Sequence, residues 1–143
     1  MKVKIKKLNK DAQIPTYANP GDAGMDVVAI SKVEAGDYIE YGTGLSFEVP
    51  EGYVLLIFPR SSVSKKDLIL ANCVGVLDSG YRGELKFRFK RLYGPFGYTH
   101  CEYNIGHKIG QIMIVPYPKI DFEEVDSLSE TERGEGGFGS TGK

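Results

Sequence analysis

Apolar residues along most of the chain alternate with polar ones or occur in short solid runs. The clearest alternation covers residues 84–90, in which Leu85, Phe87 and Phe89 are separated by basic residues. Successive side chains of a strand point to opposite faces, so this segment predicts a strand with one face in the core and the other facing solvent or a ligand. No stretch keeps the spacing of an amphipathic helix over three turns. The pattern therefore predicts an all-β protein.

The same pattern predicts further strands, with glycine, proline and asparagine between them. They cover residues 2–8, 24–30, 44–49, 53–58, 73–77, 108–115 and 121–125. One short helix is expected at residues 61–67, with Ser61 or Ser62 as its cap. Residues 92–105, which contain two glycines, a proline and three tyrosines, are expected to form a long surface loop. Many short strands in one small domain indicate a sandwich, a jelly roll or a barrel.

The length of 143 residues is typical of a single domain. A net charge of -1 at pH 7 gives no general reason to expect a nucleic acid or a membrane as partner. The sequence shows neither an apolar leader nor a run long enough to span a bilayer, so we expect a cytoplasmic protein. Cys73 and Cys101 are too few for a disulfide framework and are expected to be free thiols. His100, Cys101 and His107 lack the spacing of a zinc site.

The composition changes sharply toward the C-terminus. Residues 121–132 are rich in acids, and residues 133–142 hold five glycines together with Arg133 and Phe138. Such a segment has too little apolar surface to offset its ordering entropy, so a flexible tail is expected. A disordered terminus is one interpretation. The other is a flap over phosphates, because glycines let backbone amides approach an anion closely. We therefore expect a β domain over residues 1–132 and a lid over residues 133–143.

Two other segments carry chemistry suited to a nucleotide. Residues 59–62, PRSS, place Arg60 beside two hydroxyls and the first amides of the expected helix, which suits phosphate oxygens. A helix with an exposed arginine is an equally compatible interpretation. Residues 75–83 lead a strand into a tight turn with Asp78 and then into the next strand, and such a hairpin can hold a planar base against its backbone. An aspartate in a turn is more often only a turn former.

Five segments, in this order, resemble the five motifs of the homotrimeric deoxyuridine triphosphate nucleotidohydrolases, the dUTPases. They are residues 23–27 (AGMDV), 59–62 (PRSS), 75–83 (GVLDSGYRG), 106–111 (GHKIGQ) and 133–142 (RGEGGFGSTG). The third and fifth are highly specific. The resemblance implies a distorted jelly-roll or β-clip subunit, hydrolysis of dUTP to dUMP and pyrophosphate with Mg2+, and active sites shared by the three chains of a homotrimer.

The resemblance also implies roles for individual residues. Asp78 matches the catalytic carboxylate that orients the water attacking the α-phosphorus, and Asp26 matches the carboxylate that holds magnesium through its water shell. Tyr81 matches the ring that packs under the deoxyribose, and Phe138 the ring that stacks on uracil. Asn72 and the backbone of Val76, Leu77 and Lys86 match positions that read the uracil edge. The remaining residues expected to bind substrate are Arg60, Ser61, Ser62, Gly75, Gln111, Arg133, Gly139 and Ser140.

Three positions depart from the family pattern. Ser62 stands where glycine is usual, Lys108 replaces the usual arginine, and Gly110 replaces the usual alanine. Lysine cannot make a forked pair with a carboxylate, so the network around the catalytic centre is expected to be looser. Among the alternatives, the dCTP deaminases share the architecture but lack this tail. A regulatory or interaction protein that uses the nucleotide site as a switch, with residues 92–105 as its partner surface, remains open.

Overall fold

The computed structural model describes residues 1–92 and 101–139. Within these residues the regular structure is almost entirely β, and the helical part is one short 3-10 helix, η1 (Ser61–Lys65). The strands are β1 (Lys4–Lys7), β2 (Met25–Val28), β3 (Ser31–Ala35), β4 (Tyr38–Gly42), β5 (Leu45–Glu48), β6 (Tyr53–Phe58), β7 (Leu68–Leu70), β8 (Gly75–Leu77), β9 (Lys86–Arg91) and β10 (Lys108–Pro116).

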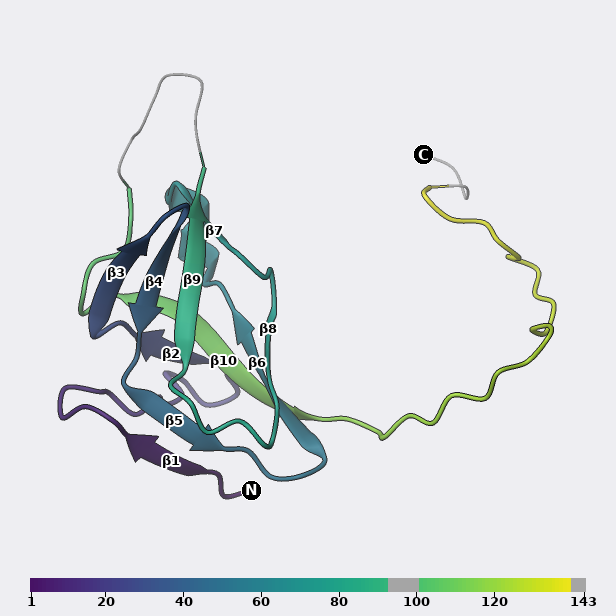
Figure 1. Ribbon diagram of the computed structural model, residues 1–143, viewed down its shortest axis with the longest axis horizontal. Coiled ribbons are helices and arrows are strands. Elements are labelled where there is room, and N and C mark those ends of the chain that lie inside the picture. Colours follow the sequence, from purple (N-terminus) through teal and green to yellow (C-terminus); the bar gives the residue numbers. More distant parts are fainter. Residues whose placement is uncertain (93–100, 140–143) are drawn as a thin grey trace.

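The strands form three antiparallel sheets (Figure 1). One four-stranded sheet has the order β2-β10-β6-β8, the other has the order β3-β4-β9-β7, and β1 pairs with β5. Buried residues of both four-stranded sheets belong to one hydrophobic cluster, so the two sheets pack on a common core. This arrangement confirms the predicted all-β, jelly-roll class.

The common core is built from inward-facing residues of both sheets. Phe87 and Phe89 of β9 are at most 1% exposed, and Val27 of β2 and Leu55 of β6 are completely buried. Gly110 of β10 lies so close to the Phe87 ring that a Cβ at this position would overlap with the ring. The glycine thus lets the two sheets approach, which explains why alanine is absent here.

Most of the predicted strands are confirmed. Observed strands lie within or overlap the predictions at residues 2–8, 24–30, 44–49, 53–58, 73–77, 84–90 and 108–115. The strand predicted at residues 121–125 is wrong: Phe122 is 90% exposed, and this segment pairs with no strand of the described residues. The sequence pattern does not predict β3, β4 or β7, because each is short: β3 has no buried residue, β4 alternates only over Ile39, Glu40 and Tyr41, and β7 has three residues.

The segment predicted as a helix at residues 61–67 differs in length and in its cap. η1 ends at Lys65, and Arg60 takes the N-cap position with an extended backbone and no capping side-chain hydrogen bond. The prediction that Ser61 or Ser62 caps the helix is therefore wrong. A short 3-10 turn forms instead, in which the Ser64 hydroxyl donates to the Ser61 carbonyl at 2.9 Å.

The hairpin predicted around Asp78 is also wrong. β8 pairs with β6, whereas β9 pairs with β4 and β7, so the chain passes from one four-stranded sheet to the other between β8 and β9. The connection is too long for a tight hairpin turn, and the Leu85 amide donates to the Leu45 carbonyl at 2.7 Å rather than to β8. This crossing leaves one backbone edge of β8 without a partner strand among the described residues.

Part of the predicted surface loop at residues 92–105, namely residues 93–100, lies outside the described residues. The remainder is not all on the surface, because Tyr103 is only 2% exposed and its ring packs against Tyr41 and Phe89. The surface prediction is wrong at this residue because an aromatic ring there completes the core.

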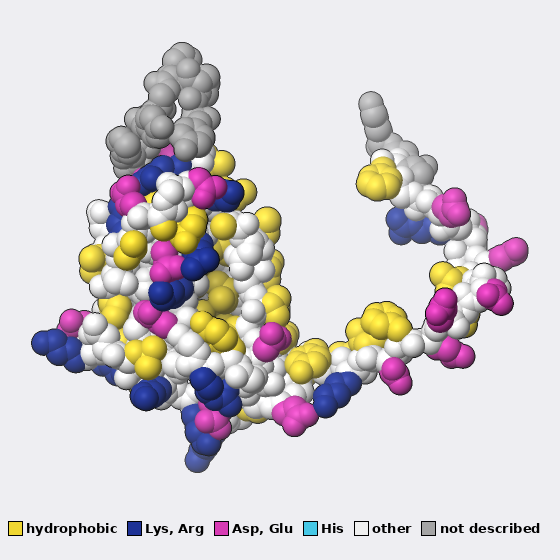
Figure 2. All heavy atoms as spheres, viewed as in Figure 1, with side chains coloured by type: hydrophobic (Ala, Val, Ile, Leu, Met, Phe, Trp, Pro, Cys, Tyr) yellow, Lys and Arg dark blue, Asp and Glu magenta, His cyan; other side chains and the backbone are white. Residues whose placement is uncertain are grey.

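Residues 117–139 leave the sheets after β10 and run as an extended segment away from them (Figure 1). Apolar and acidic side chains follow one another along this segment (Figure 2). Its large apolar residues Ile120, Phe122 and Leu128 are 71%, 90% and 86% exposed. No helix in the described part of the chain is long and apolar enough to cross a bilayer.

Candidate active site

A pocket of about 430 Å³ opens where the chain crosses between the two four-stranded sheets. Six of the residues predicted to bind or process substrate line it: Asn72, Val76, Leu77, Asp78, Tyr81 and Lys86. They come from β8, from β9 and from the turns beside them. The structure therefore brings together, in one chain, the predicted catalytic carboxylate and most of the residues predicted to surround the nucleoside, Phe138 of the tail excepted.

The wall formed by β8 has an exposed edge. Val76 is 63% exposed, while its neighbours Gly75 and Leu77 are buried. A Cβ on Gly75 would meet the Ile57 side chain at 2.9 Å and the Asn72 amide nitrogen at 3.1 Å, so glycine is needed for the strand to lie this close. Because β8 pairs only with β6 in the described residues, its outer N–H and C=O groups can bind a planar ligand.

The turn that contains Asn72 and leads into β8 has an unusual backbone. Cys73 has a φ of 57°, in the left-handed region, and its amide donates to the Leu70 carbonyl at 3.0 Å. Both Cys73 and Cys101 are exposed free thiols, as predicted. This tight turn holds Asn72 in the lining of the pocket, next to β8.

Tyr81 is held in place by the turn that carries Asp78. Its amide donates to the Asp78 carbonyl at 3.0 Å, and its hydroxyl donates to the Glu84 carbonyl at 3.2 Å. A Cβ on Gly83 would overlap with the Tyr81 ring, so the glycine gives the ring its space. The Asp78 side chain is exposed at the mouth of the pocket and has no hydrogen bond or ion pair to a described residue. A water molecule can therefore reach this carboxylate.

A ladder of charged side chains lies along β9 beside the pocket, and two of its members, Glu40 and Arg88, were not predicted from the sequence. Glu40 accepts from Lys86 at 2.7 Å and pairs with Arg88 at 2.8 Å. Hydrogen bonding from Lys86, and further from Arg88, lowers the pKa of the Glu40 carboxyl despite its partial burial. Arg88 shares the exposed face of β9 with Lys86 and also lines the pocket. The period-two pattern of β9 was the signal for Arg88, whereas Glu40 on β4 had none.

A second cluster lies around Asp26 on β2, the edge strand opposite β8 in the other four-stranded sheet. In the sheet register Asp26 on β2 is opposite Gln111 on β10. Arg60 Nε lies 2.8 Å from one carboxylate oxygen of Asp26 and Lys108 Nζ lies 3.0 Å from the other. The Gln111 amide donates to the Pro59 carbonyl at 3.1 Å. The cluster therefore joins residues of the predicted first, second and fourth motifs.

The electrostatics of this cluster follow from its two cations. Partial burial acts to raise the pKa of Asp26, but hydrogen bonds from Lys108 and Arg60 outweigh it and leave the pKa below its ordinary value. A Cβ on Gly24 would meet the Gln111 amide oxygen at 2.6 Å, so glycine lets Gln111 lie against β2. Lys108 pairs with Asp26 through a single nitrogen, consistent with the expectation that lysine cannot make a forked pair.

Asp26 suits an indirect contact with magnesium better than a direct one. Both of its carboxylate oxygens are already paired with cations. Among the described residues no group of three His, Cys, Asp or Glu side chains could hold a metal ion. Magnesium usually keeps several waters and takes its other ligands from substrate phosphates and one or two carboxylates. The donor set present fits a water-mediated contact from Asp26 to a phosphate-bound ion.

The pocket and the Asp26 cluster do not meet within one chain. β2 and β8 are the two outer strands of their sheet, separated by three strand spacings, or about 14 Å. The tail is placed elsewhere: Phe138 is fully exposed, and Arg133 Nε donates to the Gly136 carbonyl at 2.9 Å. Gly139 is exposed in the same segment, and Ser140 lies outside the described residues. The predicted site residues thus fall into three separate places.

Comparison with known proteins identifies the class to which this fold and these motifs belong. The dUTPase family model matches residues 10–142, which is most of the chain. The deoxyuridine 5'-triphosphate nucleotidohydrolase of Nautilia profundicola is 42% identical over 146 residues and covers 100% of both chains. That of Clostridium tetani is 41% identical over 148 residues, covering 99% of this chain and 97% of the relative. The chain belongs to the dUTPase family.

A solved structure agrees with this assignment. The dUTPase of Staphylococcus bacteriophage 80alpha with dUPNHPP has a TM-score of 0.81 and 28% sequence identity, and the match covers 99% of each chain. The dUTPase from phage phi11 of S. aureus, at 24% identity and a TM-score of 0.76, supports the shared fold alone.

Proposed function

We propose that the chain is a dUTP diphosphatase that hydrolyses dUTP to dUMP and pyrophosphate with Mg2+. The observation that carries this proposal is the pocket between β8 and β9, which joins an unpaired strand edge, Asn72 and Tyr81 to an accessible Asp78 carboxylate. Its volume of about 430 Å³ lies in the range of small-molecule sites. The names of the relatives, all deoxyuridine 5'-triphosphate nucleotidohydrolases, support the same substrate.

The strand edge is the proposed reader of the base. Uracil presents both hydrogen-bond donors and acceptors on one edge, and the backbone at Val76 and Leu77, on the open edge of β8, is proposed to pair with them. Asn72 and the backbone of Lys86 complete this set, and Gly75 allows it to form. Tyr81 is proposed to pack under the deoxyribose, where a 2′-hydroxyl would collide with the ring.

Asp78 is the proposed base that directs water to the α-phosphorus. The carboxylate is exposed and unpaired among the described residues, so it can accept a proton from a water held at the mouth of the pocket. A positioned base contributes roughly a hundred- to ten-thousandfold. The remaining acceleration must come from neutralising the negative charge that develops on the phosphate oxygens.

That neutralisation is assigned to the Asp26 cluster and the tail. Arg60, Ser61, Ser62 and Gln111 are proposed to bind the phosphates from one side. Magnesium, held through water by Asp26, would supply further positive charge on the phosphate oxygens. From the tail, Arg133, Gly139 and Ser140 are proposed to close over the phosphates while Phe138 stacks on uracil.

We also propose a homotrimer in which each active site combines parts of several chains. The strand register supports this arrangement. β6 and β8 are antiparallel, with Leu55 opposite Leu77, so Arg60 beyond the end of β6 and Asp78 beyond the end of β8 lie at opposite ends of the strand pair, and one chain alone does not bring them together. The extended course of residues 117–139 away from the sheets supports a tail that reaches another chain's site (Figure 1). A cytoplasmic location, without nucleic acid or membrane as partner, remains part of the proposal.

The test of the activity is a comparison of nucleotides. The protein is incubated with Mg2+ and each deoxynucleoside triphosphate in turn, and pyrophosphate release is followed. We expect strong preference for dUTP and loss of turnover when EDTA removes the metal. Comparable hydrolysis of dCTP or dTTP, or no hydrolysis of any of them, would refute the proposal.

A regulatory role is a second candidate, in addition to hydrolysis. The phage 80alpha dUTPase structure is described with the statement that phage dUTPases control transfer of virulence genes by a proto-oncogenic G protein-like mechanism. Its similarity to this chain over 99% of both lengths motivates the candidate. A switch requires that a protein partner bind the nucleotide-loaded and empty forms with different affinity, and equal capture of both forms would exclude it.

A further inference from the structure

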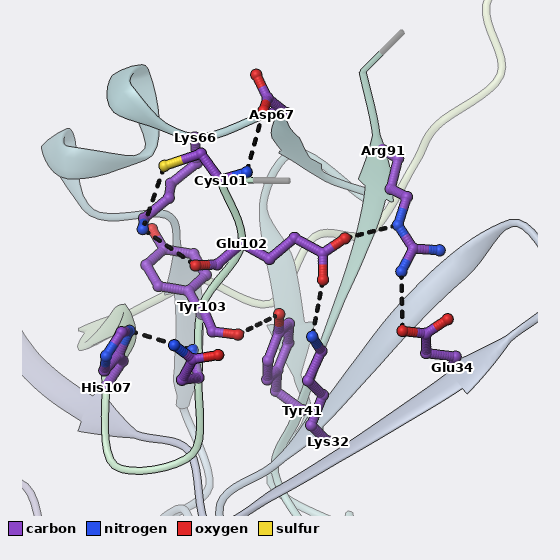
Figure 3. A network of polar contacts seen from close by, with 11 residues as sticks. Lys32, Glu34, Tyr41, Lys66, Asp67, Arg91, Cys101, Glu102, Tyr103 and His107 are labelled. Carbon is purple, nitrogen blue, oxygen red and sulfur yellow. Dashed lines mark hydrogen bonds and ion pairs between the residues drawn. The ribbon is translucent and has the colours of Figure 1, made fainter. Parts of the chain in front are cut away.

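The segment that leads into β10 is fixed against the β3-β4-β9-β7 sheet at residues 102 and 103 (Figure 3). The Glu102 carboxylate lies 2.7 Å from Lys32 Nζ and 2.7 Å from Arg91 Nε. The Tyr41 hydroxyl donates to the backbone carbonyl of Tyr103 at 2.9 Å. These contacts come from β3, β9 and β4, so the backbone at Tyr103 has little freedom to move.

The Tyr103 ring is equally constrained. It is 2% exposed, and its centre lies 6.1 Å from that of Tyr41 and 5.5 Å from that of Phe89. The Lys66 ammonium lies 5.2 Å from the ring centre (Figure 3). The hydroxyl of this ring nevertheless has no hydrogen-bond partner among the described residues. Buried hydroxyls are normally bonded, so an unpartnered one in a rigid setting calls for a physical explanation.

The surroundings of the hydroxyl supply a candidate explanation. Burial raises the pKa of the Tyr103 phenol, whereas the Ser62 hydroxyl and the Arg60 guanidinium nearby act to lower it. The geometry agrees, because Lys66 directly follows η1 and both donates to the Glu102 carbonyl at 3.1 Å and lies over the Tyr103 ring, which places the turn that carries Ser62 beside the phenol. The two hydroxyls do not meet hydrogen-bond geometry. Arg60 donates to Ser62 Oγ at 3.4 Å and to Asp26 at 2.8 Å. Tyr103 thus stands at the inner end of a polar row that continues through Ser62 and Arg60 to Asp26.

We propose that Tyr103 is a positioning residue for the phosphate-binding segment, and that its hydroxyl donates to Ser62 Oγ when Arg60 engages the substrate phosphates. This inference rests on the dUTP hydrolysis proposed above. A serine hydroxyl has two acceptor lone pairs, so Ser62 accepts from Tyr103 and Arg60 together and keeps its own proton to donate. Ser62 then ties Arg60 to the core, a link that the glycine usual at this position cannot make. The serine at position 62, where glycine is usual, thus supplies the partner that the buried Tyr103 hydroxyl otherwise lacks.

The first experiment compares wild type with Tyr103→Phe, and with Tyr117→Phe as a matched change at a tyrosine that is 40% exposed. Phenylalanine keeps the ring packing and removes an unpartnered buried hydroxyl, so Tm should stay the same or rise. KM for dUTP and Kd for the imido analogue dUPNHPP should each rise roughly 3- to 10-fold in Tyr103→Phe, the value of one lost hydrogen bond. Binding of deoxyuridine, which has no phosphates, should not change. The Tyr117→Phe control should behave as wild type throughout.

The second experiment measures coupling between the two hydroxyls. If they act together, the double variant Tyr103→Phe/Ser62→Gly should lose no more than Ser62→Gly alone, within about twofold. Independent, additive losses would overturn the inference. A lower Tm with unaltered KM in Tyr103→Phe would also overturn it, because it would show a purely structural role.

Wild type measured in parallel separates this inference from the proposed function. If wild type hydrolyses dUTP and Tyr103→Phe matches it in KM, only the positioning role fails. If wild type neither hydrolyses dUTP nor binds dUPNHPP, the proposed function fails and the positioning role falls with it.

Discussion

Replacing Glu102 with glutamine should destabilise the fold substantially, because this carboxylate is shared by two partly buried cations. The side chain of Glu102 is 11% exposed, that of Arg91 19% and that of Lys32 25%. Hydrogen bonds to charged groups contribute about 1.5 to 3 kcal/mol each, and glutamine keeps one acceptor oxygen but no charge. Residual solvent screening reduces the loss of charge pairing. We therefore expect Glu102→Gln to lower the free energy of unfolding by about 2 to 3 kcal/mol at pH 7.

The pH dependence of this loss has a defined sign. Partial burial acts to raise the pKa of Glu102, but hydrogen bonds from Arg91 and Lys32 outweigh it, so the pKa in the folded state is lowered. A carboxyl with a lowered folded pKa stabilises the protein above its unfolded pKa of about 4.3. This stabilisation is lost as the pH falls through the folded pKa. The difference between wild type and Glu102→Gln should therefore be full at pH 7 and shrink below about pH 4.

Urea denaturation at pH 7 and at about pH 3 measures both effects. Glu48→Gln is the matched control, because Glu48 pairs with Lys4 at 2.8 Å but the two side chains are 45% and 81% exposed. An exposed pair of this kind contributes little to stability, because solvent screens it. Equal losses in the two variants, or a Glu102→Gln effect that persists unchanged at low pH, would show that the Glu102 charge does not stabilise the fold.

Three further perturbations test other parts of the account. Asp78→Asn should keep the Kd for dUPNHPP within about threefold and lower kcat roughly a hundred- to ten-thousandfold; normal turnover would show that water is activated elsewhere. Gly110→Ala should lower the free energy of unfolding by about 1 to 3 kcal/mol in urea titrations, because its Cβ meets the Phe87 ring, whereas Gly137→Ala, in open space, should be neutral. Deleting residues 133–143 should leave the far-ultraviolet circular dichroism of the β fold unchanged and abolish most turnover; an active truncated protein would remove the tail from the mechanism.

Local patterning was sufficient to predict much of the fold. The alternation in β9 predicts both its strand state and its buried face, because Phe87 and Phe89 face a core that the period of two already implies. The same signal is too short to be recognised in β3 and β4: β3 has no buried residue, and in β4 the alternation covers only Ile39, Glu40 and Tyr41. These strands exist because β4 pairs with β9 along its length, a contact between distant segments that no local pattern contains.

The candidate site also contains residues that the sequence predicts and residues that it does not. Asn72, Val76, Asp78 and Tyr81 could be gathered from sequence because one motif and its neighbouring strand carry nearly all of the pocket. Glu40 could not, because it reaches the pocket wall only through the pairing of β4 with β9. The contact of Tyr103 with the Glu102, Arg91 and Lys32 network could not be predicted either. No local pattern signals a buried ring next to a carboxylate that two cations share.

The most direct test of the shared active site is complementation between two inactive variants. Asp78→Asn chains and Arg60→Ala chains are unfolded, mixed in equal amounts, refolded together and assayed for pyrophosphate release from dUTP. If each site takes Asp78 from one chain and Arg60 from another, random assembly should restore about a quarter of wild-type activity. Activity no greater than that of the two variants refolded separately would contradict the account, because it would mean that each chain contains a complete site of its own.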